Sequence, residues 1–372
     1  MMEAGEDIVI VGAGIAGLTT SLGLHRLGIR SLILESSGSL RVTGYALATW
    51  TNAWRALDAV SLADSLQQRH QPLSGIVGTS TISGLQTTER SFEGKGKQLD
   101  NFRLICSGDH EFRCVQRKLL LEALANELPS GALRFSSKVV TVEESGFHKL
   151  VHLADGTILK TKQWPSGWAS RNLLSQGDLP LGGVYISSAV MGLGINSCNF
   201  FWKGVRSGCI PCDDHTVYWF FTWTPSPSSQ EKEIEDNPAE MKRLVLSKIG
   251  KVPDEVRAII ENTRMTLAKV VVLPWKMVVL ARCLAEAFLK EPSGEKLAER
   301  EEYKKIEMGL KKYTKERRWR SIELITTSYV VGFIQQSDGK VMTFLRDKLL
   351  AVLLAGLLVK KSSFDCGKLS IS

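Results

Sequence analysis

Three glycines near the start of the chain have the spacing that places backbone N–H groups around a phosphate. Gly12, Gly14 and Gly17 follow an apolar run at 8–11, and the helical pattern after them ends at Gly28. In this order Gly12 permits a tight turn, Gly14 lets N–H groups approach a pyrophosphate, and Gly17 lets the helix pack close to the strand. The positive end of the helix dipole then faces the phosphates.

An acidic residue completes this pattern. Glu35 follows the next apolar run, at 32–34, where a carboxylate can accept hydrogen bonds from an adenosine ribose. The carboxylate would repel a 2′-phosphate, so the site favours FAD or NAD over NADP. The alternative is a glycine turn that serves packing alone. The predicted dinucleotide-binding residues are Gly12, Ala13, Gly14, Ile15, Ala16, Gly17 and Glu35.

The elements around this unit predict an α/β fold. We expect a Rossmann-like FAD/NAD(P)-binding domain, an inserted β-rich substrate domain and C-terminal helices. A β-meander is predicted over 133–160, because an Asp-Gly hairpin signal separates its β-prone runs. The predicted helices are 115–128, 238–250, 276–290, 296–328 and 340–360.

Two other motifs have simpler interpretations. Trp219, Phe221 and Trp223 alternate along a β-prone run, which favours one face of a core sheet over a substrate-stacking site. Cys209 and Cys212 form a C-x-x-C pair without a second pair for zinc, so redox or metal use is disfavoured. None of the six histidines has metal-ligand spacing, and no metal site is predicted.

Composition narrows the class of protein further. The chain has 372 residues, 44% of them hydrophobic and 23% charged, and a formal net charge of +8. No basic stripe interleaved with aromatic residues indicates a nucleic-acid surface. The longest apolar run, 349–359, is shorter than the about 20 residues that span a bilayer. The glycine turn starts so close to Met1 that we expect no signal or transit peptide, and the odd number of cysteines fits a reducing, cytoplasmic location.

Several stretches together resemble FAD-dependent, aromatic-ring-hydroxylase-type (class A) monooxygenases, particularly the plant monooxygenase group. The resemblance begins with the glycine turn and Glu35 and continues in the Arg41-Val-Thr-Gly loop, which the helix at 51–57 follows. It includes the R-x-x-L-x-x-x-L helix that begins at Arg117 and the Asp-Gly hairpin at 155–156. The aromatic strand and the stretch 280–369 also match. The resemblance implies that Arg41 and Arg117 contact FAD, that NAD(P)H is the co-substrate, and that O₂ adds to the reduced flavin as a peroxyflavin. The implied reaction is hydroxylation of a small aromatic or heterocyclic substrate.

The expected domains are discontinuous. Residues 1–75, 105–162 and 265–372 are assigned to the FAD-binding domain. Residues 76–104 and 163–264 are assigned to a partly irregular, β-rich, substrate-domain-like insert.

Two segments of the family's pattern are absent from the chain. No Asp-Gly motif follows the meander, and the strand and Gly-Asp loop that precede the helix at 277–284 in the family have no counterpart. In the family that loop holds the flavin's ribityl chain. The alternative function is therefore a non-catalytic, truncated or splice-altered nucleotide-binding relative, and an NAD-dependent oxidoreductase is a more distant one. Loss of a strand also predicts exposed apolar surface near 274–280.

Overall fold

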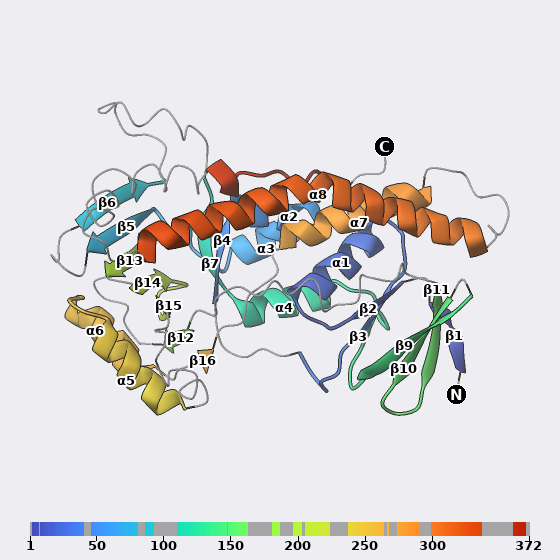
Figure 1. Cartoon of the computed structure of the whole chain (residues 1–372), viewed down its shortest axis with the longest axis horizontal. Coiled ribbons are helices and arrows are strands. Elements are labelled where there is room, and N and C mark those ends of the chain that lie inside the picture. The colour runs from blue at the N-terminus through green and yellow to red at the C-terminus, as the bar shows by residue number, and fades with distance from the viewer. Residues whose placement is uncertain are drawn as a thin grey trace.

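A computed structural model gives the arrangement of the chain (Figure 1). It describes residues 2–6, 8–40, 46–80, 86–92, 110–146, 148–162, 181–186, 196–202, 205–223, 237–263, 266–267, 274–289, 299–336 and 360–369.

A short parallel sheet carries the glycine turn. Its strand order is β2 (Val9–Val11), β3 (Leu32–Leu34) and β8 (Leu133–Arg134), and helix α1 (Ile15–Arg26) connects the first two strands. All three residues of β3 are buried, as expected for an unbroken apolar run in a parallel sheet. The prediction that the meander begins at 133 is wrong: β8 pairs with β3 instead, and the Ile33 N–H donates to the Ala132 carbonyl at 2.8 Å.

The meander itself is confirmed beyond that point. Strands β9 (Val139–Ser145), β10 (His148–Leu153) and β11 (Ile158–Lys162) run antiparallel, and β1 (Met2–Glu6) pairs parallel with β11. Gly156 has a positive φ of 83° at the tight turn before β11, a conformation that glycine adopts without strain. Apolar residues of β10 and β11 pack against β3, so this sheet covers one side of the parallel sheet.

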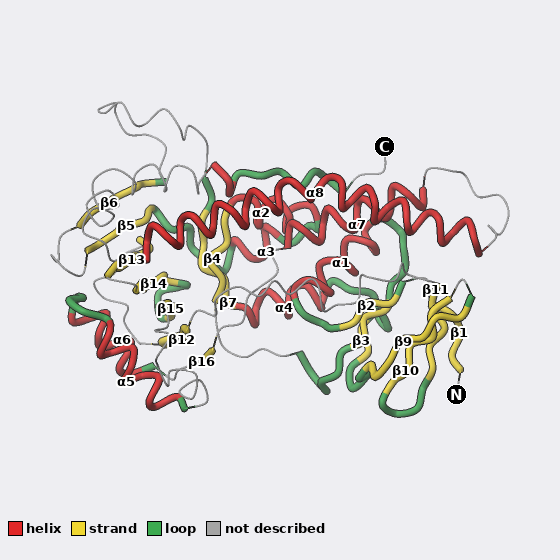
Figure 2. The backbone as a smooth tube through the Cα atoms, viewed as in Figure 1, coloured by secondary structure: helices red, strands yellow, loops and turns green. Residues whose placement is uncertain are grey.

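A larger mixed sheet forms the other end of the molecule (Figure 2). Its seven strands lie in the order β16-β12-β15-β14-β13-β5-β6. Their bounds are β5 (Gly75–Ser80), β6 (Gln86–Ser91), β12 (Leu181–Ile186), β13 (Asn196–Trp202), β14 (Val205–Pro211), β15 (Thr216–Trp223) and β16 (Thr266–Leu267).

The two faces of this sheet pack against different partners. Trp219 and Phe221 are 1% and 0% exposed and pack with apolar residues of α5 (Pro238–Lys248) and α6 (Asp254–Asn262), which confirms the core-face interpretation for these two side chains. Tyr218 on the opposite face packs toward a two-stranded ribbon, β4 (Ala46–Trp50) with β7 (Phe112–Gln116). The ribbon therefore joins the larger sheet to the rest of the protein.

A layer of helices covers the parallel sheet on the side away from the meander (Figure 1). Besides α1, the helices of this layer are α2 (Thr51–Ala59), α3 (Ala63–Gln67), α4 (Arg117–Asn126), α7 (Pro274–Leu289) and α8 (Glu299–Gln336). Helix α7 lies between α1 and α8, and α8 extends far enough to contact strands of the seven-stranded sheet.

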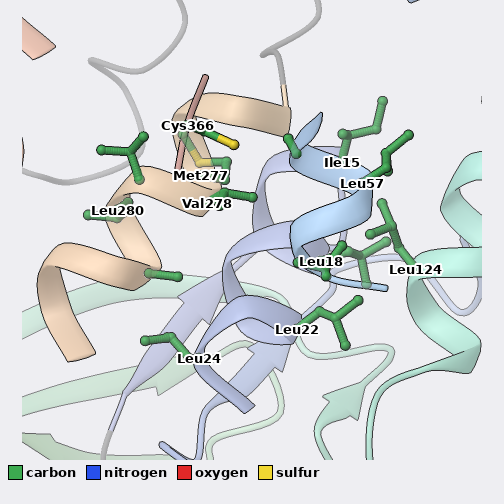
Figure 3. Packing of buried hydrophobic residues seen from close by; sticks show 14 of the residues in the cluster. Ile15, Leu18, Leu22, Leu24, Leu57, Leu124, Met277, Val278, Leu280 and Cys366 are labelled. Atoms are coloured by element: carbon green, nitrogen blue, oxygen red, sulfur yellow. The ribbon is translucent and has the colours of Figure 1, made fainter. Parts of the chain in front are cut away.

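The expectation of exposed apolar surface near 274–280 is wrong for the side chains described there. Met277, Val278, Val279 and Leu280 are all at most 5% exposed, and they lie in the same cluster as the apolar residues of α1 and α2 (Figure 3). The close approach has a specific cause: a Cβ atom on Gly23 of α1 would lie 2.8 Å from the Cβ of Ala281. Absence of a side chain at Gly23 lets α7 pack closely against α1.

The other predicted helices agree with the structure in type and differ in extent. Helix α8 ends at Gln336, beyond the predicted 328, and α6 was not predicted. The predicted helix at 340–360 falls almost entirely outside the described residues. None of the described helices combines the length and apolar character needed to cross a membrane. The domain boundaries expected from the sequence stay a prediction.

Substitution of Leu280 tests the packing of α7. We expect Leu280→Ala to lower the free energy of unfolding by about 2–5 kcal/mol, because it leaves a cavity in the helical core. The control is Ile325→Ala on α8, where the side chain is 65% exposed and the change should stay within about 0.5 kcal/mol. Urea unfolding followed by circular dichroism measures both, and equal effects would contradict burial of α7.

Candidate functional site

The glycine turn lies between the end of β2 and the start of α1. Gly12 has a positive φ of 99°, and its N–H donates to the Leu34 carbonyl at 2.8 Å, which ties the turn to the end of β3. Gly14 is the residue before the helix, with no side-chain cap, and the first turn of α1 holds no acidic residue. Because the first N–H groups of a helix have no partner within the helix, this end of α1 suits an anion.

Gly14 and Gly17 have different physical roles. A Cβ atom on Gly17 would lie 2.1 Å from the Gly12 carbonyl oxygen, so no larger residue fits without moving the turn. A Cβ atom on Gly14 would meet nothing within 4 Å. Gly17 is therefore required by packing, whereas the space beside Gly14 is open for a ligand that approaches the backbone. Ala13 and Ile15 are buried around this space, and Ala16 is partly buried.

Glu35 closes the turn from the neighbouring strand. Its Oε2 accepts a hydrogen bond from the Ala13 N–H at 2.8 Å, and its Oε1 accepts one from the Ser37 N–H at 2.9 Å. The Ser36 hydroxyl donates to Oε1 at 3.2 Å, and the side chain is largely buried. A carboxylate has about four acceptor positions, so one such group can serve several donors at once. The sequence pattern placed Glu35 near the turn, but it did not reveal the contact with Ala13.

A second helix begins beside the first, and sequence reasoning did not include it in the site. Helices α1 and α7 run side by side in the same direction, so their positive ends lie on the same side of the core (Figures 1 and 3). Lys276 lies in the first turn of α7; burial, and then the nearby Arg317, lower the pKa of its ammonium group. Pro274 as the first residue of α7 is the sequence signal for this start.

The structure describes one of the two arginines that are predicted to contact FAD. Arg117 is the first residue of α4, half-buried, directly after strand β7 of the ribbon. Helix α4 packs against α1, the helix that follows the glycine turn. Arg41 lies outside the described residues. The roles of Arg41 and Arg117 in cofactor binding stay predictions.

The described residues of this region include the predicted adenosine and pyrophosphate unit of a dinucleotide site, and their role in binding stays a prediction. The turn, the start of α1 and Glu35 fit a ribose and two phosphates. Among the residues that the structure describes, no Gly-Asp loop precedes α7, which starts at Pro274. The two Gly-Asp pairs of the sequence, at 108–109 and 177–178, lie outside the described residues.

Comparison with known sequences decides the family. A model of the lycopene cyclase protein family matches residues 7–164, the part with the turn, Glu35 and the meander. Monooxygenase 2 of Arabidopsis thaliana is 43% identical to the chain over 418 residues, which cover 99% of both sequences. The chain belongs to the FAD-dependent class A monooxygenases. Monooxygenase 1 of the same plant is 28% identical, and its alignment covers 97% of this family member and 99% of the relative.

Solved structures of flavin-dependent hydroxylases share the fold. HpxO of Klebsiella pneumoniae, in complex with FAD and uric acid, superposes with a TM-score of 0.72 at 15% identity and covers 96% of each chain. The 2,6-dihydroxypyridine-3-hydroxylase of Arthrobacter nicotinovorans gives a TM-score of 0.66 at 15% identity, over 91% of this monooxygenase and 94% of the hydroxylase. The predicted α/β architecture with C-terminal helices is thereby confirmed.

The alignment with Monooxygenase 2 is longer than this chain. It runs over 418 residues, whereas the chain has 372, so the relative contains stretches without a counterpart here. The monooxygenase fold therefore persists in a chain that is shorter than its relative.

Two alanine substitutions separate the role of the turn in binding from its role in folding. Gly14 has φ −79° and ψ 175°, which alanine adopts freely, so Gly14→Ala should fold normally. Its methyl group would occupy the open space, and we expect FAD affinity to fall at least about tenfold, or about 1.4 kcal/mol. The control Gly17→Ala should instead lower the free energy of unfolding by about 3 kcal/mol. Flavin-fluorescence titration and urea unfolding measure both quantities, and wild-type affinity in Gly14→Ala would contradict phosphate binding at this turn.

Proposed function

We propose that this chain is an FAD- and NAD(P)H-dependent monooxygenase that hydroxylates a small aromatic or heterocyclic substrate. The observation that carries the proposal is the joint arrangement of the glycine turn, the uncapped start of α1 and the Glu35 carboxylate. The family assignment supplies the reaction class, and FAD is the cofactor of relatives such as the FAD-dependent monooxygenase penM of Penicillium crustosum.

The chain's own residues would hold the cofactor by its adenosine and pyrophosphate. N–H groups from Gly14 to Gly17, at the start of α1, would donate to the phosphate oxygens, and the dipole of α1 would favour their negative charge. Glu35 would accept hydrogen bonds from the ribose hydroxyl groups while it keeps the turn closed through Ala13. When bound, FAD supplies the electron transfer and the activation of O₂, neither of which a side chain provides.

Arg117 would act on the other side of the cofactor. Its guanidinium group carries a permanent positive charge and several donors at the start of α4, next to the ribbon that contacts the seven-stranded sheet. From this place it would fix the cofactor between the parallel sheet and the substrate side.

The proposed substrate class rests on relatives and on one feature of the chain. HpxO was solved with uric acid, and another relative is a 2,6-dihydroxypyridine hydroxylase, and both ligands are small flat rings. Aromatic side chains gather where the ribbon meets the larger sheet: the rings of Trp50 and Phe112 stack with centroids 4.2 Å apart, and Phe92 packs edge-on to Trp50 at 5.8 Å. Such surroundings favour a planar apolar ligand at their margin.

A second function is favoured by the absent flavin segments. A chain that holds the adenosine and pyrophosphate but not the isoalloxazine would bind nucleotides without turnover, because productive orientation of the flavin is lost. The alternative is therefore a non-catalytic, nucleotide-binding relative of the plant monooxygenases.

A turnover assay separates the two functions. The chain is saturated with FAD, and NADH or NADPH oxidation and O₂ uptake are followed with and without a panel of hydroxylated benzoates and purines. The monooxygenase proposal expects reduced-nicotinamide consumption that a ring substrate stimulates, and Gly14→Ala should need at least about tenfold more FAD to reach half of its maximal rate. FAD or ADP binding without any consumption would reject it and leave the non-catalytic alternative.

A further inference from the structure

The C-x-x-C motif does not act as a unit in the folded chain. Cys209 is buried within β14, opposite Cys198 of β13 in the antiparallel register. Cys212 lies just past the end of β14 and is directed to a third strand. Its partner is Cys114 of β7, and Cys212 donates a thiol hydrogen bond to the Cys114 sulfur.

The sulfur atoms of Cys114 and Cys212 lie almost close enough to form a disulfide bond. The two Sγ atoms are 3.0 Å apart, although the residues are 98 positions apart in the chain. Both cysteines are free thiols, and their side chains are 0% and 2% exposed. A disulfide has a sulfur–sulfur distance of about 2.05 Å, so the sulfur atoms must approach by about 1 Å.

We propose that Cys114 and Cys212 are a modification site at which a peroxide forms a disulfide between β7 of the ribbon and the β14–β15 turn. The site is separate from the glycine turn, and the proposal does not depend on turnover of the enzyme.

The chemical step balances with one peroxide. A thiol sulfur attacks the O–O bond of hydrogen peroxide and becomes a sulfenic acid, and one water leaves. The second thiol then displaces the hydroxyl group from that sulfur, so the S–S bond forms and a second water leaves. Two sulfur atoms are oxidised, both peroxide oxygens are reduced, and an external dithiol reverses the reaction.

Burial controls the rate of this step. Desolvation by burial, and then the hydrogen bond between the two thiols, raise the pKa of the Cys114 thiol well above its usual value. Because the thiolate is the reactive form, oxidation should be slow at neutral pH and faster in alkaline buffer. Once one sulfur is oxidised, the short distance favours closure over reaction with a distant thiol.

The disulfide would link β7 to the β14–β15 turn at a place where side chains already form hydrogen bonds. The Gln116 amide donates to Asp213 Oδ2 at 2.9 Å, and Gln71 donates to Asp214 Oδ1 at 3.3 Å. Arg117 follows Gln116 directly at the start of α4. Oxidation would therefore fix the start of α4 against the substrate-side sheet.

The experiment is peptide mapping of the full chain after oxidation. The reduced protein is treated with hydrogen peroxide at alkaline pH, alkylated without reduction and digested with trypsin. Cleavage at Arg113, Arg117, Arg206 and Lys232 releases Cys114 in 114–117, and both Cys209 and Cys212 in 207–232. We expect these two peptides to appear cross-linked, and fragmentation of the pair to place the link at Cys212.

Matched variants and a stability readout complete the test. Cys209→Ala, changed in the same tryptic peptide, should keep the cross-link, whereas Cys212→Ala and Cys114→Ala should lose it. Oxidation should raise Tm of the wild type and Cys209→Ala by about 5 °C or more, because the bond closes a long loop, and dithiothreitol should reverse the rise. A link that maps to Cys209, or alkylation of both Cys114 and Cys212 after peroxide has oxidised other thiols, would overturn the proposal. The wild-type map decides between these results even if a variant fails to fold.

Discussion

The carboxylate of Glu35 is the contact on which the glycine turn, and the dinucleotide site proposed there, depend. It accepts hydrogen bonds from the N–H groups of Ala13, in the glycine turn, and of Ser37, beyond β3. One side chain thereby joins the ends of the parallel strands β2 and β3. Hydrogen bonds to a charged group each contribute about 1.5–3 kcal/mol, which is enough to hold a turn that contains a positive-φ glycine. In the proposed function the same charge has a second role, because a carboxylate would favour a ribose hydroxyl over a 2′-phosphate.

Close packing of α1 against α7 is the second constraint. The two helices approach at Gly23 and Ala281, and α7 places apolar residues from Met277 to Leu280 in the core around Leu18 and Leu57 (Figure 3). This packing explains how the chain retains the family's fold although it is shorter than its plant relative.

Much of the fold could be predicted from the sequence because local patterns determine it. The glycine spacing with Glu35 indicates strand, turn and helix, and the Asp-Gly signal indicates the hairpin of the meander. The pairing of Leu133 and Arg134 with β3 could not be predicted, because two residues have no period and their partner lies a hundred positions away. Burial at 277–280 was missed for a similar reason: an apolar stretch does not reveal which surface covers it. The contact of Cys212 with Cys114 is also long-range, and local spacing pointed to Cys209 instead.

The most direct measurement is the visible absorption spectrum of the purified chain after incubation with excess FAD and removal of the unbound fraction, beside Glu35→Gln treated in the same way. The account predicts retained flavin bands in the wild type and weaker bands in Glu35→Gln, since the neutral amide can accept hydrogen bonds from Ala13 or Ser37 at only one of its two ends. A colourless wild type, or equal retention by both proteins, would contradict the central role of the turn and its carboxylate in holding FAD.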